Sequence, residues 1–207
     1  IILEKAEEAF RQKRFQDVIQ LLANLNQTSA RMHELLGYSY GQLGNLKLTE
    51  KHLLDASKKQ NCSIEVFYYL GLLYVQLNKP SLTIKYLRQA IAKNDEFFEA
   101  HFLLGNALAQ QQMFQSAVDH YLKALKINDA NPDLLFNLGN TYCDLGIIEK
   151  CIECYQRCLA INPMHIDCIL NFGVVYSQIG NPKKALEYFE RLSNWTTIPT
   201  TIKADLY

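Results

Sequence analysis

Glycine recurs at a fixed interval through most of the chain. The interval is 34 residues, and each glycine lies in an apolar run that otherwise has the pattern of a buried helix. The five positions are Gly37, Gly71, Gly105, Gly139 and Gly173. A fixed period of this length is typical of repeat proteins, in which one small unit stacks on copies of itself. The sequence therefore predicts an all-α solenoid without a single central core.

Glycine at these positions also predicts how the helices pack. In the middle of a helix it is about 1 kcal/mol less favourable than alanine, so five cost about 5 kcal/mol. That cost is comparable with the net stability of an ordinary domain, about 5–15 kcal/mol. It is offset if a neighbouring helix lies directly against the backbone. We therefore expect a close helix–helix approach at each of the five glycines.

Each repeat is predicted to contain two helices joined by a short turn. Gly44, Gly146 and Gly180 occupy one slot of that turn, and Asn78 takes the slot in another unit; these are the residues that most easily end a helix in the left-handed conformation. The predicted divisions are a degenerate first repeat at 1–29, full repeats at 30–63, 64–97, 98–131, 132–165 and 166–199, and the start of a further or capping helix at 200–207. All of them are assigned to one solenoid domain.

The unit 132–165 carries further marks of a known repeat. They are Leu135, Leu138, Gly139, Tyr142, Cys151, Tyr155, Cys158 and Pro163. This pattern resembles the tetratricopeptide repeat (TPR) family, although Thr49 and Thr83 replace a small residue, and Leu53 and Leu87 an aromatic one. The resemblance implies an all-α, right-handed superhelical solenoid of antiparallel helix pairs, with about six repeats and the start of another helix.

The resemblance also implies a binding surface, because ligands of this family usually lie along the concave face lined by the first helix of each repeat. The residues expected to contact a partner there are Tyr38, Gln42, Tyr68, Gln76, Glu99, Phe102, Asn106, Gln110, Asp133, Phe136, Asn140, Asp144 and Gln178. The amides at the thirteenth place of each unit can both donate to and accept from a peptide backbone. The aromatic residues at the fifth place could act as anchors. Two alternatives stay open: the amides form a solvated rim, and the aromatic rings pack on neighbouring helices.

The charges expected on this face bear on the partner. Carboxylates predominate at the inward positions, namely Glu34, Glu65, Glu99, Asp133 and Asp167, against the single cation Arg31. A row of carboxylates repels an acidic tail, so we expect no clamp for the carboxylate tail of a chaperone. The predicted partner is an extended peptide or a helix that is basic or neutral.

Composition excludes other classes of partner. Lysine plus arginine and aspartate plus glutamate both number 21, so the net charge is zero. Nucleic-acid binding needs a basic field, which this balance does not supply. No apolar run reaches the roughly 18 residues that span a bilayer, and charges from Glu4 onward argue against a secretion signal. Because the chain starts without methionine and ends within a helical pattern, we expect a piece of a longer protein.

The six cysteines invite a metal or disulfide interpretation. Cys151, Cys154 and Cys158 share a helix face, with Cys168 nearby, but Cys151 and Cys158 occupy small-residue positions where cysteine acts as an apolar filler. Structural zinc sites usually present paired ligands from loops. We therefore expect no metal and no cofactor. The spacing does not resemble a disulfide framework, which favours a reducing, cytoplasmic location, with nuclear and ciliary locations left open.

No catalytic grouping is evident. His33 and His101 hold the bulky fourth place and are predicted to be buried, whereas His52 and His120 are predicted to be exposed. No nucleophile–histidine arrangement and no phosphate-binding glycine motif follow from the repeat register. The chain is therefore predicted not to be an enzyme.

Three functions remain. The first is an interaction scaffold that binds a peptide or helix within a larger complex. The second is the substrate-targeting arm of an intracellular enzyme, such as an O-linked sugar transferase, whose catalytic domain is absent here. The third is a structural subunit of an anaphase-promoting or ciliary transport assembly. Self-association through the solenoid ends is a further expectation.

Overall fold

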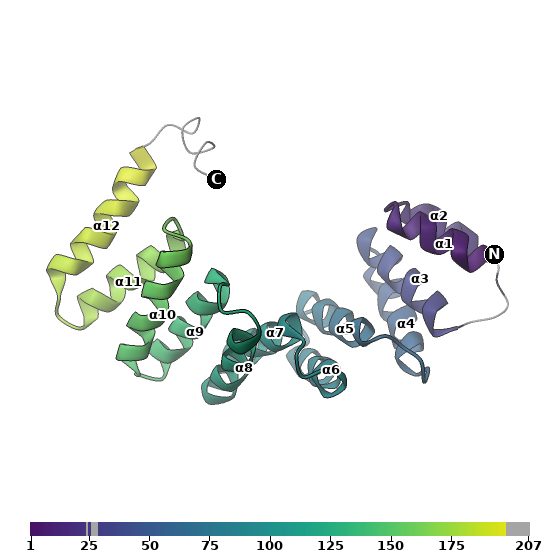
Figure 1. Ribbon diagram of the computed structural model, residues 1–207, viewed down its shortest axis with the longest axis horizontal. Helices are drawn as coiled ribbons and strands as arrows, with labels where there is room; N and C mark the ends of the chain where they lie inside the picture. Colours follow the sequence, from purple (N-terminus) through teal and green to yellow (C-terminus); the bar gives the residue numbers. More distant parts are fainter. Residues whose placement is uncertain (24, 26–28, 198–207) are drawn as a thin grey trace. The chain divides into compact units, whose positions relative to one another are not determined.

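The computed structural model describes residues 1–23, 25 and 29–197 (Figure 1). Within these residues all regular secondary structure is helical. The predicted segment 200–207 and part of the predicted join after the first repeat lie outside the described residues. The chain divides into two compact units, Ile1–Gln111 and Gln112–Tyr207.

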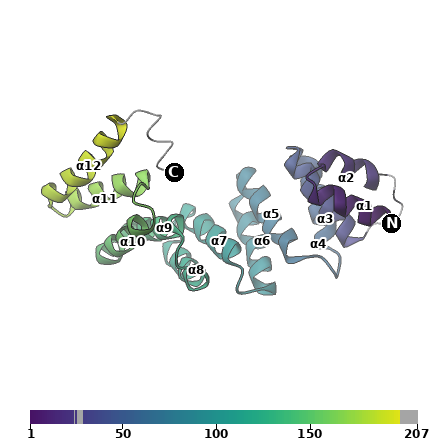
Figure 2. The ribbon, with the colours of Figure 1, turned by 45° about the horizontal axis from the view of Figure 1, so that its top comes forward.

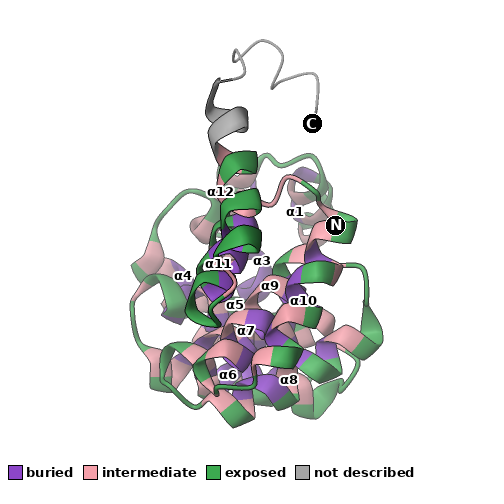
Figure 3. Cartoon of the chain, turned by 90° about the vertical axis from the view of Figure 1, so that its left-hand side faces the viewer, coloured by how far each residue is buried: buried purple, intermediate pink, exposed green. Residues whose placement is uncertain are grey.

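The amino-terminal unit holds seven of the described helices. They are α1 (Ile2–Arg11), α2 (Phe15–Leu22), α3 (Ala30–Gln42), α4 (Leu46–Ser57), α5 (Ile64–Gln76), α6 (Pro80–Lys93) and α7 (Phe98–Gln110). Each helix contacts the next along the chain, so the unit grows by stacking (Figure 2). Buried residues lie where the helices meet, and exposed residues lie on the outer faces and turns (Figure 3).

The carboxy-terminal unit is built in the same way. Its described helices are α8 (Phe114–Ile127), α9 (Pro132–Asp144), α10 (Ile148–Ile161), α11 (Ile166–Gln178) and α12 (Pro182–Thr197). Here too each helix packs against its successor. No helix in the described part of the chain is both long and apolar enough to cross a membrane.

The predicted close approach at the repeat glycines is confirmed at four of them. A methyl carbon added to the glycine would lie 2.7 Å from Leu53 Cδ2 at Gly37, and 2.6 Å from Leu87 Cδ2 at Gly71. The same contact is made by a ring atom in the other unit, with Tyr155 opposite Gly139 and Phe189 opposite Gly173. The second helix of the pair therefore inserts a side chain where the first helix has none.

The turns adopt the predicted left-handed conformation. The φ angles are 77° at Gly44, 73° at Gly146, 75° at Gly180 and 52° at Asn78. Lys13 and Gln112 adopt it as well, with φ angles of 57° and 58°, although neither residue type favours it. After each helix the chain closes a tight turn; for example, Asn45 N–H donates to the Tyr40 carbonyl at 2.9 Å.

Two expectations from the sequence are wrong. The thiols of Cys143 in α9 and Cys151 in α10 are joined in a disulfide, with Cα atoms 5.4 Å apart. Two helices folded back on each other across the turn at Gly146 bring these positions face to face, which a search for loop-based disulfides does not reveal. His52 and His120 are both half-buried rather than exposed, and Nδ1 of His52 lies 3.1 Å from Nδ1 of the buried His33.

Candidate functional site

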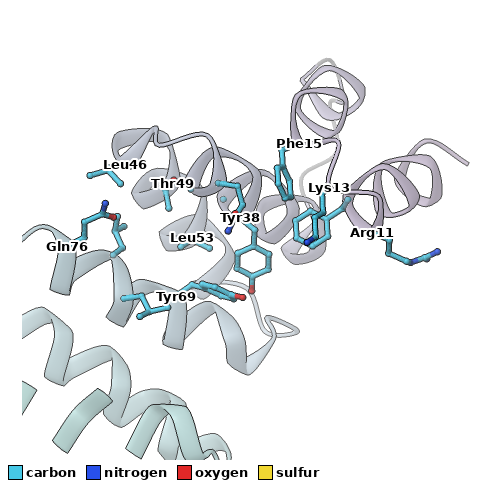
Figure 4. Close-up of a pocket in the computed structure, with 15 residues that line it drawn as sticks. Arg11, Lys13, Phe15, Tyr38, Leu46, Thr49, Leu53, Tyr69 and Gln76 are labelled. Carbon is cyan, nitrogen blue, oxygen red and sulfur yellow. The ribbon is translucent and has the colours of Figure 1, made fainter. Parts of the chain in front are cut away.

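An open groove of about 600 Å³ lies in the amino-terminal unit (Figure 4). Side chains from α3, α4 and α5 line it, together with residues at the end of α1 and the start of α2. Volumes of this size are typical of sites that hold a small ligand or a few residues of a peptide. This groove is therefore the candidate binding site of the unit.

Aromatic rings form one wall of the groove. The ring centroids of Tyr38 and Tyr69 lie 4.5 Å apart, and those of Phe10 and Tyr38 lie 6.2 Å apart. Phe15 meets Phe10 edge-on at 5.7 Å. Tyr38 is half-buried and burial raises the pKa of its hydroxyl, so this group stays protonated. The wall is therefore uncharged, and Tyr69, 39% exposed, leaves ring surface for a ligand.

The floor of the groove is apolar and includes two glycines of α3. Leu46, Leu53, Leu72 and Leu73 contribute side chains to it. At Gly41 an added methyl carbon would meet only Thr49, at 3.5 Å and beyond, which is ordinary contact distance. Gly41 therefore does not serve close helix packing as Gly37 does; its missing side chain keeps the groove open.

Polar and charged groups also line the groove. Gln42 and Gln76 are exposed, and no hydrogen bond within the described residues engages their side-chain amides. Arg11 and Lys13 also line the groove, and no aspartate or glutamate does. Arg11 pairs with Glu8 at 2.5 Å. Lys13 has no ion pair among the described residues, so its positive charge, unlike that of Arg11, is not balanced by a carboxylate.

The predicted contact residues of the amino-terminal unit are only partly gathered here. Tyr38, Gln42 and Gln76 line the groove. Tyr68 does not, because its ring packs on Phe97 with centroids 5.2 Å apart. Four further predicted residues lie on α7 outside the groove, the first two exposed and the last two half-buried: Glu99, Gln110, Phe102 and Asn106.

In the carboxy-terminal unit the predicted residues are used largely for internal contacts. Asn140 Oδ1 accepts hydrogen bonds from the Tyr155 hydroxyl at 2.5 Å and from Asn171 Nδ2 at 3.0 Å. Phe136 packs on His165 with ring centroids 4.8 Å apart, as the packing alternative predicts. The three others are exposed, and the first of them lies 3.2 Å from His165 Nε2: Asp133, Asp144 and Gln178.

The predicted row of inward carboxylates needs a correction at Glu34. Its side chain is buried, and Oε1 accepts a hydrogen bond from the Ser63 backbone N–H at 2.6 Å. Its other oxygen pairs with Arg31 at 3.3 Å. Glu34 therefore fastens α3 to the start of α5 and presents no charge to a partner.

Several groove residues escaped the sequence analysis. Tyr69 lies at the sixth place of its unit, next to the expected Tyr68, and its ring enters the groove instead. Phe10, Phe15 and Lys13 belong to the degenerate first repeat, where register is weakest. The one sequence signal for these residues was the pair Phe10 and Phe15, which lie on either side of the turn between two short helices.

The described residues include no cluster of three or more histidine, cysteine or carboxylate side chains able to hold a metal ion. Cys151 and Cys158 are fully buried at the small positions, and Cys154 and Cys168 are buried beside them. Burial raises the pKa of Cys154 to about 11, which keeps it a thiol at neutral pH. These cysteines therefore belong to the packing of α9, α10 and α11.

Sequence profiles of one repeat family match most of the predicted full repeats. Profiles described as TPR repeat or tetratricopeptide repeat match residues 65–96, 105–146, 132–165 and 166–196. No curated protein is similar enough in sequence to match the chain.

Solved structures share the fold at low sequence identity. A crystal structure of MamA has 23% identity and a TM-score of 0.75, over 83% of this chain and 98% of that one. YrrB, described as a TPR protein with an unusual peptide-binding site, has 22% identity and a TM-score of 0.75, over 81% and 88%. MamA from Desulfovibrio magneticus RS-1 has 16% identity and a TM-score of 0.77, over 82% and 96%. All three are similar in fold.

Proposed function

Because the chain belongs to the tetratricopeptide repeat family, we propose that it is a protein-interaction scaffold whose groove in Ile1–Gln111 binds a peptide or helical segment of a partner. The observation that carries the proposal is the groove itself. It combines an aromatic wall, an apolar floor and two amides free to meet a peptide backbone. The peptide-binding site of the similarly folded YrrB supports it.

The physical case rests on water and preorganisation. Apolar surface in an open groove of about 600 Å³ is in contact with water, and release of that water favours an apolar ligand. The walls come from packed helices, so little ordering is needed on binding. Aromatic rings are the side chains that most often dominate such binding energies. We propose no catalytic role, because the groove offers no nucleophile with a base beside it.

The other predicted roles are less well supported. A substrate-targeting arm that binds through side-chain amides would need those amides free, but Asn171 donates to Asn140 within its own unit. A place in a larger assembly and self-association through the solenoid ends stay predictions, as do the contacts expected from Asp144 and Gln178. The Cys143–Cys151 disulfide does not support the predicted cytoplasmic location, because disulfides persist mainly in oxidising compartments.

Selection of a random peptide library displayed on phage tests the proposal. The immobilised chain is expected to enrich peptides, and Gly41→Leu should abolish their binding because the new side chain fills the groove. Gln60→Leu, an exposed position outside the groove, is the control for added apolar surface. Failure to enrich any peptide, or equal binding to wild type and Gly41→Leu, would contradict the proposal.

A further inference from the structure

We infer that the partner segment carries a large apolar or aromatic anchor with an aspartate or glutamate beside it, and that Lys13 meets this carboxylate. The inference rests on the proposed function and names the chemistry of its ligand. It replaces, at this groove, the basic or neutral partner expected from the sequence. Three observations carry it: the charge of the lining, the placement of Lys13 and the fate of the nearby carboxylates.

The charge of the lining is one-sided. Arg11 and Lys13 are the charged residues of the groove, and no carboxylate lines it. Glu8 balances Arg11 at 2.5 Å and also accepts a hydrogen bond from Gln12 at 2.7 Å. Lys13 has no such partner in the described part of the chain, so a basic segment would meet an uncompensated like charge. An acidic group would meet a free ammonium.

Lys13 is held at the groove by the backbone. It occupies the left-handed position of the α1–α2 turn, with a φ angle of 57°, and Arg14 N–H donates to the Ala9 carbonyl at 2.9 Å behind it. Three equivalent slots carry glycine, which adopts this conformation without strain, and two carry Asn78 and Gln112; the three glycines are Gly44, Gly146 and Gly180. A lysine here therefore has a conformational cost, and it places a cation in the lining of the groove (Figure 4).

Carboxylates near the groove either pair with other residues or lie outside its lining. Of those that suggested a basic partner in this unit, Glu34 is buried, whereas Glu65 and Glu99 are exposed but do not line the groove. Glu7 pairs with Arg31 at 2.8 Å, and Glu34 is buried against Ser63. Asp17 pairs with Arg14 at 2.6 Å. None of these carboxylates lines the groove, so their charges do not compete with an acidic ligand for Lys13.

The geometry assigns an order to the ligand. The anchor occupies the apolar floor between Leu53 and Leu72, beside the Tyr38 and Tyr69 rings, while its backbone passes Gln42 and Gln76. The carboxylate lies toward Lys13, on the side of α1. Because the ammonium is exposed, its contribution is modest and sensitive to salt.

Three synthetic peptides test the inference by fluorescence anisotropy on the whole chain. They share one apolar centre, taken from the phage selection, and are flanked by aspartates, glutamines or lysines. The aspartate peptide is expected to bind about threefold to fivefold more tightly than the glutamine peptide, and the lysine peptide most weakly. The difference should shrink as the salt concentration rises to about 0.5 M.

Variants assign the effect to Lys13. Lys13→Gly removes the charge and relaxes the turn, so weaker binding of the aspartate peptide by this variant cannot come from unfolding. Lys13→Glu should reverse the order and favour the lysine peptide. Lys47→Glu makes the same charge change at an exposed residue outside the groove and should leave the order as in wild type.

Different results would contradict the proposed function and this inference. If no peptide binds, or if Gly41→Leu leaves binding unchanged, the proposed function is wrong. If peptides bind in the groove but the lysine or glutamine peptide binds as tightly as the aspartate peptide, the proposed function stands and this inference is overturned. An aspartate preference that survives both Lys13→Gly and Lys13→Glu would overturn it as well.

Discussion

Gly37 in α3 lies directly against Leu53 in α4. A methyl carbon on Gly37 would lie 2.7 Å from Leu53 Cδ2 and 3.3 Å from Leu53 N. We predict that Gly37→Ala destabilises the protein. Overpacking costs about 1–3 kcal/mol, and the better helix propensity of alanine returns at most about 1 kcal/mol. Urea unfolding followed by circular dichroism should show a lower midpoint; an unchanged or higher midpoint would show that the close approach is not needed.

Gly41, one helical turn further along α3, should respond in the opposite way. A methyl carbon added at Gly41 would meet only Thr49, at ordinary contact distance, and the backbone there is helical. Gly41→Ala is therefore expected to raise the free energy of unfolding by about 0.5–1 kcal/mol, because alanine favours the helix. In the same urea experiment, a destabilised Gly41→Ala would mean that this glycine has a packing role that its surroundings do not explain.

These two glycines also show which packing features could be predicted from the sequence and which could not. The 34-residue period identified Gly37 as a packing position, and the helix pairs followed, because burial of one face repeats with the unit. Gly41 lies outside that period. Its role depends on the open space beside Thr49, which arises only when α3, α4 and α5 are packed together.

Residues of the candidate site could be predicted only where they occupy the positions that the repeat register assigns to the concave face. Tyr38, Gln42 and Gln76 obey it and line the groove. Tyr68 obeys it but packs on Phe97, and Tyr69 takes its place, because a shift of one residue turns a helical side chain by about 100°. Lys13 and Phe15 lie in a repeat whose sequence departs most from the others, so no register could place them.

The His33–His52 contact predicts sensitivity to acid. The pKa of each histidine is lowered chiefly by burial, and that of His52 also by the charge of His33. The unfolded chain therefore takes up protons more readily as pH falls. Stability conferred by the neutral pair is fully present above about pH 6.5 and is lost progressively below it.

Charges around the pair act in both directions. Asp55 raises the pKa of both histidines and Lys51 lowers that of both, while Lys58 and Lys59 lower that of His33. Unfolding midpoints in urea, measured between about pH 7.5 and 5, should fall for wild type and fall less for His52→Gln. Identical pH dependence in the two proteins would show that the pair does not contribute.

The Cys143–Cys151 disulfide should stabilise the carboxy-terminal unit. It closes a short loop with a sequence separation of 8 residues, for which the chain-entropy relation gives about 2.5 kcal/mol. Reduction with dithiothreitol is expected to lower the unfolding midpoint of wild type. The Cys143→Ser, Cys151→Ala double variant should start lower and not respond to the reductant.

Alkylation of the unfolded, unreduced chain identifies the bonded cysteines. Mass spectrometry should find alkylation at the four free cysteines and none at Cys143 or Cys151. The four expected sites are Cys62, Cys154, Cys158 and Cys168. Alkylation of all six would show that the disulfide is absent from the protein as isolated.

Photo-cross-linking is the most direct test of peptide binding in the groove, because it locates a bound peptide without relying on a variant. A selected peptide is synthesised with a photo-reactive diazirine at its apolar anchor, and the cross-linked residues are identified by mass spectrometry. If the peptide binds in the groove, cross-links are expected to groove residues of α3, α4 and α5, such as Tyr38, Leu53 and Tyr69. Cross-links confined to residues outside the groove would contradict peptide binding there.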